Sequence, residues 1–130
     1  NLYRKPSGGQ TAMLTLDKLS AFGADVESGM RRCVNKESLY LRLVKMVPGN
    51  DGFEKLREAV AAGDYEAGFQ AAHDLKGVTT NLSLDSLSKP IIEITEHFRN
   101  REEADYQSLL AIIERKRAEL AGLCSDGFSS

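Results

Sequence analysis

Apolar residues recur along most of this chain three and four positions apart, the spacing that gives a helix one buried face. No stretch alternates apolar and polar residues in the way that a half-buried strand does. Residues that start or stop helices interrupt the pattern repeatedly, so several separate helices are expected. The sequence therefore predicts an all-α fold.

The first third of the sequence predicts three short helices. One spans about residues 16–22 and stops at Gly23, and Asp25 is placed to cap the second. Asn35 is placed to cap the third, which the segment Val47-Pro48-Gly49 ends. The apolar positions that share a face of the third helix, and that we expect to be buried, are Leu39, Leu43 and Met46.

Four longer helices follow. The first spans about residues 51–62 and stops at Gly63, and Asp64 caps the second, which spans about residues 65–82. A turn over residues 83–86 leads to the third. The apolar stripes of the third and fourth helices are Leu87, Ile91, Ile94 and Phe98, and Tyr106, Leu109, Ile113 and Leu120. Short connections predict an antiparallel four-helix bundle with short additional N-terminal helices packed against it.

Pro90 lies within the stripe of the third long helix. Proline lacks an amide N–H and is tolerated in the first turn of a helix. Two alternatives are therefore open: regular hydrogen bonding begins near Ser88, or the helix enters with a kink.

Length and composition indicate one domain and disfavour some classes of protein. The chain has 130 residues, 42% of them hydrophobic, which is enough for one compact core and too few for a second catalytic domain. Seventeen basic and nineteen acidic residues leave a formal charge of -2, which disfavours nucleic acid as a partner. Cys33 and Cys124 fit no metal-binding or redox spacing, and no apolar run is long enough to span a bilayer. We expect a soluble segment that makes no membrane contact.

Both ends of the chain differ from its middle. Residues 1–13 contain Pro and Gly without apolar periodicity and predict a linker or tag-like segment, and residues 125–130 predict a flexible tail. The helical domain then spans residues 14–124. The chain begins without Met. A freestanding protein and a piece of a larger one both stay open, and the linker-like ends slightly favour the piece.

The helix predicted over residues 65–82 carries His73 on its polar side. Successive helical residues turn by about 100°, which places one set of small and apolar residues on the buried side. These are Gly68, Ala71, Leu75, Val78 and Leu82. The face that His73 shares consists of Glu66, Phe69, Gln70, Lys76, Gly77 and Thr80. We therefore expect a solvent-accessible imidazole near the middle of a rigid helix.

Three neighbours of His73 make chemical sense together. Gly77 lies one turn after it, and glycine there costs roughly 1 kcal/mol of helix propensity relative to alanine, as expected if something large must approach the ring. Lys76 is within reach of an anionic group placed on the imidazole. Phe69, one turn before, offers an apolar contact to a docking partner. Each feature alone is common on helix surfaces, and their combination favours a functional site.

The segment His73-Asp74-Leu75-Lys76-Gly77, with Ala71-Ala72 before it and the run to Leu82 after it, resembles the H-x-L-K-G signature of histidine-phosphotransfer (HPt) domains. The resemblance extends over roughly residues 16–123, because the order of short helices followed by four bundle helices is also similar. The family more often has Ser or Ala at Val78 and Thr79, and Gly at Ser83. These departures affect packing more than chemistry.

The resemblance implies that His73 accepts a phosphoryl group from an aspartyl phosphate on one receiver domain and passes it to an aspartate on another. The neutral imidazole supplies the nucleophilic nitrogen, and Lys76 stabilises the phosphoryl charge. The implied partners are response-regulator receiver domains and a sensor kinase. We expect a monomeric carrier without stand-alone catalysis, metal or cofactor, with Mg²⁺ only in the receiver. The expected location is cytoplasmic, including the cytoplasmic portion of a membrane-bound sensor kinase.

Bundle geometry adds further candidates. If the turn after this helix is centred near Leu84, antiparallel pairing places His73 at about the height of Thr95, with Arg99 one turn further on. Either their side chains support the imidazole or phosphoryl oxygens, or they form an ordinary solvated flank. Partner choice would depend on Phe69, Gln70 and Thr80 and on positions of the front helices that the sequence does not place.

Two other functions compete with phosphotransfer. A non-catalytic helical adaptor would dock signalling proteins through the same surface, because a fold does not determine a function. A metal-binding bundle that uses His73 and His97 is disfavoured, because no His/Glu pair four residues apart recurs on facing helices.

Overall fold

The structure, a computed structural model of the chain, describes residues 13–125. This part consists of seven α-helices and one short 3-10 helix and contains no strand. The helices are α1 (Leu16–Phe22), α2 (Val26–Arg32), α3 (Glu37–Met46), the 3-10 helix η3 (Val47–Gly49), α4 (Gly52–Ala62), α5 (Tyr65–Asn81), α6 (Asp85–Arg99) and α7 (Tyr106–Cys124). The all-α prediction is confirmed. The predicted linker and tail lie almost entirely outside the described residues.

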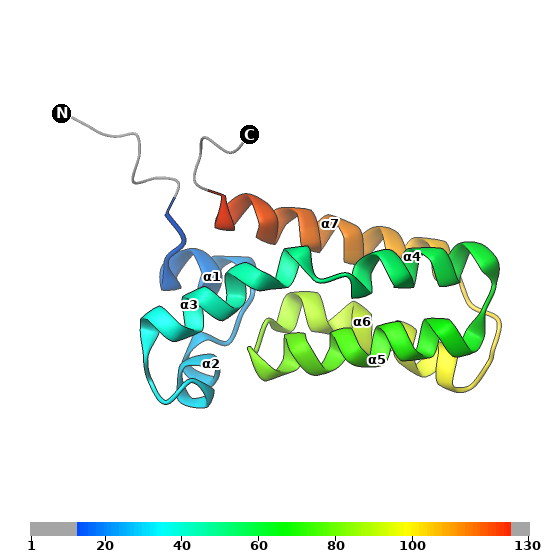
Figure 1. Cartoon of the computed structure of the whole chain (residues 1–130), viewed down its shortest axis with the longest axis horizontal. Coiled ribbons are helices and arrows are strands. Elements are labelled where there is room, and N and C mark those ends of the chain that lie inside the picture. The colour runs from blue at the N-terminus through cyan, green and yellow to red at the C-terminus, as the bar shows by residue number, and fades with distance from the viewer. Residues whose placement is uncertain (1–12, 126–130) are drawn as a thin grey trace.

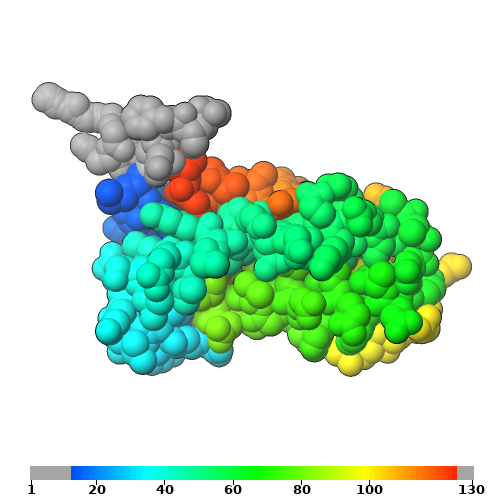
Figure 2. All heavy atoms as spheres, viewed as in Figure 1, coloured from blue at the N-terminus to red at the C-terminus, as the bar shows by residue number. Residues whose placement is uncertain are grey.

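The four longer helices form a closed bundle. Helix α5 packs against α4 and α6, and α7 packs against α6 and α4, so each helix has two neighbours. Figure 1 shows these helices side by side along the long axis, with α1, α2 and α3 gathered at one end. In the space-filling view of Figure 2, the front helices cover that end of the bundle. The predicted four-helix bundle with additional N-terminal helices is confirmed.

The core follows the predicted stripes of α6 and α7. The buried members of these stripes are Leu87, Ile91, Ile94, Phe98, Leu109, Ile113 and Leu120. Helix α6 runs from Asp85 to Arg99 with Pro90 inside it. Its first α-helical hydrogen bond is donated by the Ser88 amide to the Leu84 carbonyl at 2.9 Å, so regular hydrogen bonding begins at Ser88, as the first alternative states. The Ser88 hydroxyl donates a hydrogen bond of 2.9 Å to the Leu84 carbonyl in this first turn.

The prediction for α3 is wrong by one residue. Asn35 does not cap the helix, because it adopts a left-handed conformation (φ 58) and Lys36 occupies the N-cap position. The buried face carries Tyr40, Val44 and Val47. Of the predicted stripe, Leu39 and Leu43 are half-buried against the core, whereas Met46 is 66% exposed. Both stripes have the same four-three spacing, so periodicity alone does not separate them.

Tyr40 decides which stripe of α3 is buried. Its ring fills the space beside Gly29, where an added Cβ would lie 2.5 Å from a ring carbon. Its hydroxyl donates a hydrogen bond of 2.9 Å to the Leu82 carbonyl at the end of α5. Burial raises the pKa of Tyr40 to about 12, so the hydroxyl remains a proton donor. This contact attaches α3 to α5.

Backbone hydrogen bonds also attach the front helices to the turn between α5 and α6. The Asp25 amide donates to the Ser83 carbonyl at 2.9 Å, and the Ser86 amide donates to the Gly23 carbonyl at 3.2 Å. The front helices are thus held at the C-terminal end of α5. His73 lies in the middle of the same helix.

Candidate functional site

His73 lies on the exposed face of helix α5, whose opposite face is buried. The Asp64 side chain caps the helix by accepting a hydrogen bond of 3.0 Å from the Ala67 amide. The helix buries Gly68, Ala71, Ala72, Leu75 and Thr79, while Val78 is half-buried. His73 is exposed, as the helical periodicity predicts.

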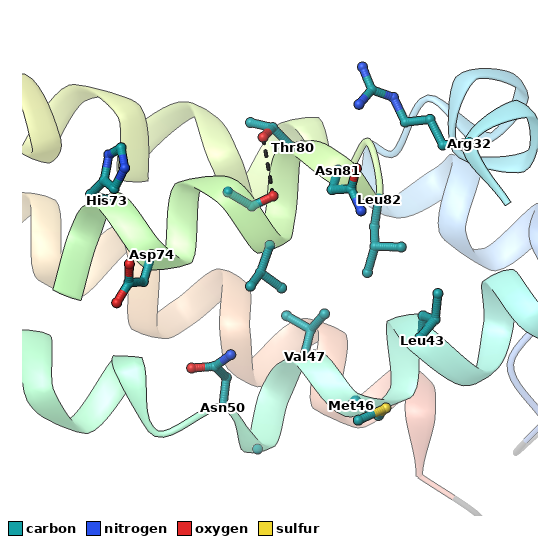
Figure 3. A pocket seen from close by; sticks show the side chains of 13 residues that line it. Arg32, Leu43, Met46, Val47, Asn50, His73, Asp74, Thr80, Asn81 and Leu82 are labelled. Atoms are coloured by element: carbon teal, nitrogen blue, oxygen red, sulfur yellow. Dashed lines mark hydrogen bonds between the residues drawn. The ribbon is translucent and has the colours of Figure 1, made fainter. Parts of the chain in front are cut away.

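A groove of about 910 Å³ runs along α5 beside His73. Its other walls come from α3, η3 and the segment that leads into α4, with Arg32 of α2 at one end. In Figure 3, His73 and Thr80 stand along one edge of the groove, and Asp74 points toward it. The apolar lining consists of Leu43, Met46, Val47, Val78 and Leu82.

The other predicted docking residues separate in the structure. Thr80 lines the same groove as His73, and its hydroxyl donates a hydrogen bond of 2.7 Å to the Lys76 carbonyl. Gln70 is exposed and lines a second, smaller cavity of about 440 Å³ between α4 and α5. Asp74 lines both cavities.

Near His73, Gly77 leaves open space, and Lys76 lacks an ion-pair partner among residues 13–125. Lys76 is half-buried. A Cβ added at Gly77 would meet nothing within 4 Å, the imidazole included. Packing among residues 13–125 therefore gives no reason for glycine at this position.

His73 belongs to a stack of three side chains on the side of α5 that faces α6. The imidazole and the Phe69 ring lie with centroids 5.4 Å apart and planes at 23°. The Arg99 guanidinium carbon lies 4.9 Å from the Phe69 centroid, and its Nε is 3.3 Å from a carboxylate oxygen of Glu96. We call this group the Arg99–Phe69–His73 stack.

Gly68 explains why the stack forms. A Cβ added at Gly68 would lie 2.4 Å from atoms of the Phe98 ring, so only glycine leaves that ring its place. Helices α5 and α6 can therefore approach closely at this point. Phe69 and Arg99 each follow one of these two residues along the chain, and the close approach brings them together.

Thr95 is buried in the core of the bundle. Its side chain is completely buried, and its hydroxyl donates a hydrogen bond of 2.6 Å to the Ile91 carbonyl. The residue lies one helical turn after Ile91 and shares the buried face of α6. Thr95 is therefore not part of a solvated flank, and its hydroxyl bonds within α6. Arg99 lies over Phe69, which stacks on His73.

Met46 is a groove residue that the sequence analysis missed. Its assignment to the core stripe of α3 concealed it, although its exposed apolar side chain borders the groove beside His73. Leu43 had been assigned to the same core stripe, and Arg32 was missed because the positions of the front helices depend on contacts between distant parts of the chain. An exposed methionine at the edge of an apolar groove is a common feature of docking surfaces.

The fold and the site together define a class of protein. It is a helical bundle that presents one exposed histidine from the middle of a helix, and residues 13–125 contain no group of three or more His, Cys, Asp or Glu that could hold a metal ion. A sequence model described as the Hpt domain matches residues 49–125, more than half of the chain and all of α4 to α7. The chain therefore belongs to the Hpt domain family.

This family carries out histidine phosphotransfer in phosphorelays and interacts with response-regulator receiver domains. The match begins at Gly49, so α1, α2 and α3 precede it. Comparison with curated proteins and with solved structures gives no match. Within the part of the chain that the structure describes, no helix is long and apolar enough to cross a membrane.

Proposed function

We propose that His73 is the phosphoryl acceptor of this domain, and that it receives the group from one receiver domain and passes it to another. The observation that carries the proposal is the exposed imidazole in the middle of α5, within the segment that matches the family. A neutral ring nitrogen would attack phosphorus with its lone pair while the aspartyl carboxylate leaves. Reversal of the same step onto a second carboxylate would complete the transfer.

The surroundings of His73 support a mechanism in which this domain supplies the acceptor and its partner supplies the metal ion. Lys76 has no competing carboxylate in the described residues, so its ammonium is available to phosphoryl oxygens on His73. Gly77 leaves room for the approaching carboxyl phosphate. The Mg²⁺ that phosphoryl transfer needs would come with the receiver. This chain would act as a carrier in the cytoplasm, with no stand-alone catalysis.

The test is to incubate the domain with a phosphorylated receiver domain and to locate the label by mass spectrometry. We expect one phosphoryl group, on His73, with the stability of a phosphoramidate: lost in acid and retained in alkali. A label on serine or threonine would show the opposite stability in acid. The absence of any label with several receivers would contradict the proposal and leave the adaptor function.

The groove beside His73 is the surface on which the receiver would dock. A receiver that brings its aspartyl phosphate to the imidazole must cover the neighbouring surface, and this apolar groove borders His73 directly. Met46 is its most exposed apolar side chain. Aromatic residues and Met are enriched in the buried centres of such interfaces.

Met46→Asp is expected to weaken receiver binding by about tenfold or more, because a carboxylate would be desolvated in an apolar contact. Isothermal titration calorimetry would measure the affinity. Met13→Asp is the matched control, since Met13 is 64% exposed and does not line the groove. Equal affinities of the two variants would place the docking surface elsewhere.

A further inference from the structure

The Phe69 ring is already engaged by two side chains of this domain. The His73 imidazole stacks on it with centroids 5.4 Å apart, and the Arg99 guanidinium carbon lies over it at 4.9 Å from its centroid, so both groups occupy part of the surface that a partner could contact. The residue is half-buried, yet the two groups that cover it are exposed and polar. The contacts of Phe69 are therefore those of a support for His73 more than those of a docking residue.

The stack restricts an imidazole that would otherwise be free. An exposed histidine on a helix samples at least two χ1 rotamers and two orientations about χ2. An offset ring partner at this separation favours one of them, because the positive edges and negative faces of the two rings must align. The Arg99 guanidinium, which lies over the phenyl ring, holds that ring in turn.

We propose that Phe69, supported by Arg99, is a positioning residue that holds the His73 imidazole in the orientation from which it accepts the phosphoryl group. The inference rests on the proposed function of His73. It gives the side chains between His73 and α6 the role of orienting the imidazole. Arg99 acts through Phe69 in this arrangement. Its guanidinium is engaged by the phenyl ring and by Glu96. Among residues 13–125, no hydrogen bond joins Arg99 or Thr95 to the imidazole.

The expected kinetic effect is on the transfer step. If Phe69→Leu releases the imidazole into about four orientations of similar energy, the single-turnover rate at saturating phosphorylated receiver falls about threefold to fivefold. The receiver concentration that gives half of the maximal rate stays unchanged. Phe69→Tyr retains the ring faces and is expected to retain the rate. A raised half-saturation concentration with an unchanged maximal rate would overturn positioning and indicate docking.

Arg99 is tested by combination with Phe69. We expect Arg99→Met to slow transfer in the wild-type background and to have no further effect in Phe69→Leu. Arg101→Met, an exposed arginine outside the stack, is the matched control. An equal effect of Arg99→Met in both backgrounds would mean that Arg99 acts on the phosphoryl group directly, and would overturn its role through Phe69.

Proton NMR of the isolated domain tests the orientation without any partner. The Phe69 ring is expected to shift the His73 ring protons upfield and to give cross-relaxation between the two rings, and both signals should disappear in Phe69→Leu and persist in Phe69→Tyr. A wild-type domain that takes no label would overturn the proposed function. A labelled domain whose His73 shifts do not respond to Phe69→Leu would overturn the positioning role alone.

Discussion

The variant His73→Gln is expected to take no phosphoryl label under conditions that label the wild-type domain, a loss of at least about 100-fold. Glutamine keeps the helix propensity, the polarity and much of the volume of the side chain, so α5 and the groove should be preserved. Its amide nitrogen has no available lone pair with which to attack phosphorus. Transfer of radiolabel from a phosphorylated receiver would measure the loss.

His97→Gln is the matched control for this experiment. His97 lies at the end of α6, where its ring contacts the carboxylate of Glu102, and it does not line the groove beside His73. This variant should take label at nearly the wild-type rate. Receiver affinity should also be unchanged in His73→Gln, which separates loss of the acceptor from loss of docking. Equal labelling of His73→Gln and the wild type would contradict the assignment of the acceptor.

Alanine is expected to have opposite effects at the two glycines of α5. Gly68→Ala should lower the free energy of unfolding by about 2 kcal/mol, because overpacking exceeds the gain in helix propensity. The added Cβ would lie 2.4 Å from the Phe98 ring. That ring is buried and stacks on Tyr106 with centroids 4.6 Å apart, so it has no space to move into.

Gly77→Ala should instead raise the free energy of unfolding by about 1 kcal/mol, because the Cβ meets open space and alanine favours the helix. It should nevertheless slow phosphotransfer. Helical side chains lean toward the N-terminus, so a side chain at this position lies over the turn that carries His73. Urea denaturation and the labelling rate would measure the two effects.

Two further variants make the glycine prediction specific. Gly122 of α7 also faces open space, so Gly122→Ala should leave the transfer rate unchanged. Phe98→Leu should reduce the loss in free energy of unfolding that Gly68→Ala causes. A double-mutant cycle would detect this as non-additivity. A Gly68→Ala variant as stable as the wild type would contradict the close packing of α5 against α6. A Gly77→Ala variant with the wild-type labelling rate would contradict the role of Gly77 in leaving space beside His73.

Most helix boundaries of this domain were predictable because the signals that set them are local. Gly23 and Gly63 adopt left-handed conformations that end α1 and α4, and the side chains of Asp25 and Asp64 cap the helices that follow. Each of these interactions involves residues within one turn of helix. The stripe of α6 was equally clear, because only one set of its apolar positions follows the helical spacing.

The register of α3 was not predictable, because its sequence carries two apolar stripes of the same spacing. Tyr40 is buried because its ring fits beside Gly29 and its hydroxyl reaches the Leu82 carbonyl, which is distant in the sequence. Thr95 illustrates the same limit in α6. Its height along the bundle follows from the length of the turn, whereas its direction depends on the rotation of α6 about its own axis.

The sequence by itself determined that this is an all-α domain with His73 exposed on one helix, since periodicity and caps act within each helix. Only the tertiary structure decided what surrounds that histidine. The groove that includes Met46 requires α3 and α5 to lie together, and the Arg99–Phe69–His73 stack requires α6 to approach α5 at Gly68. Such contacts join residues far apart in the chain, so they depend on how whole helices pack and not on any local pattern.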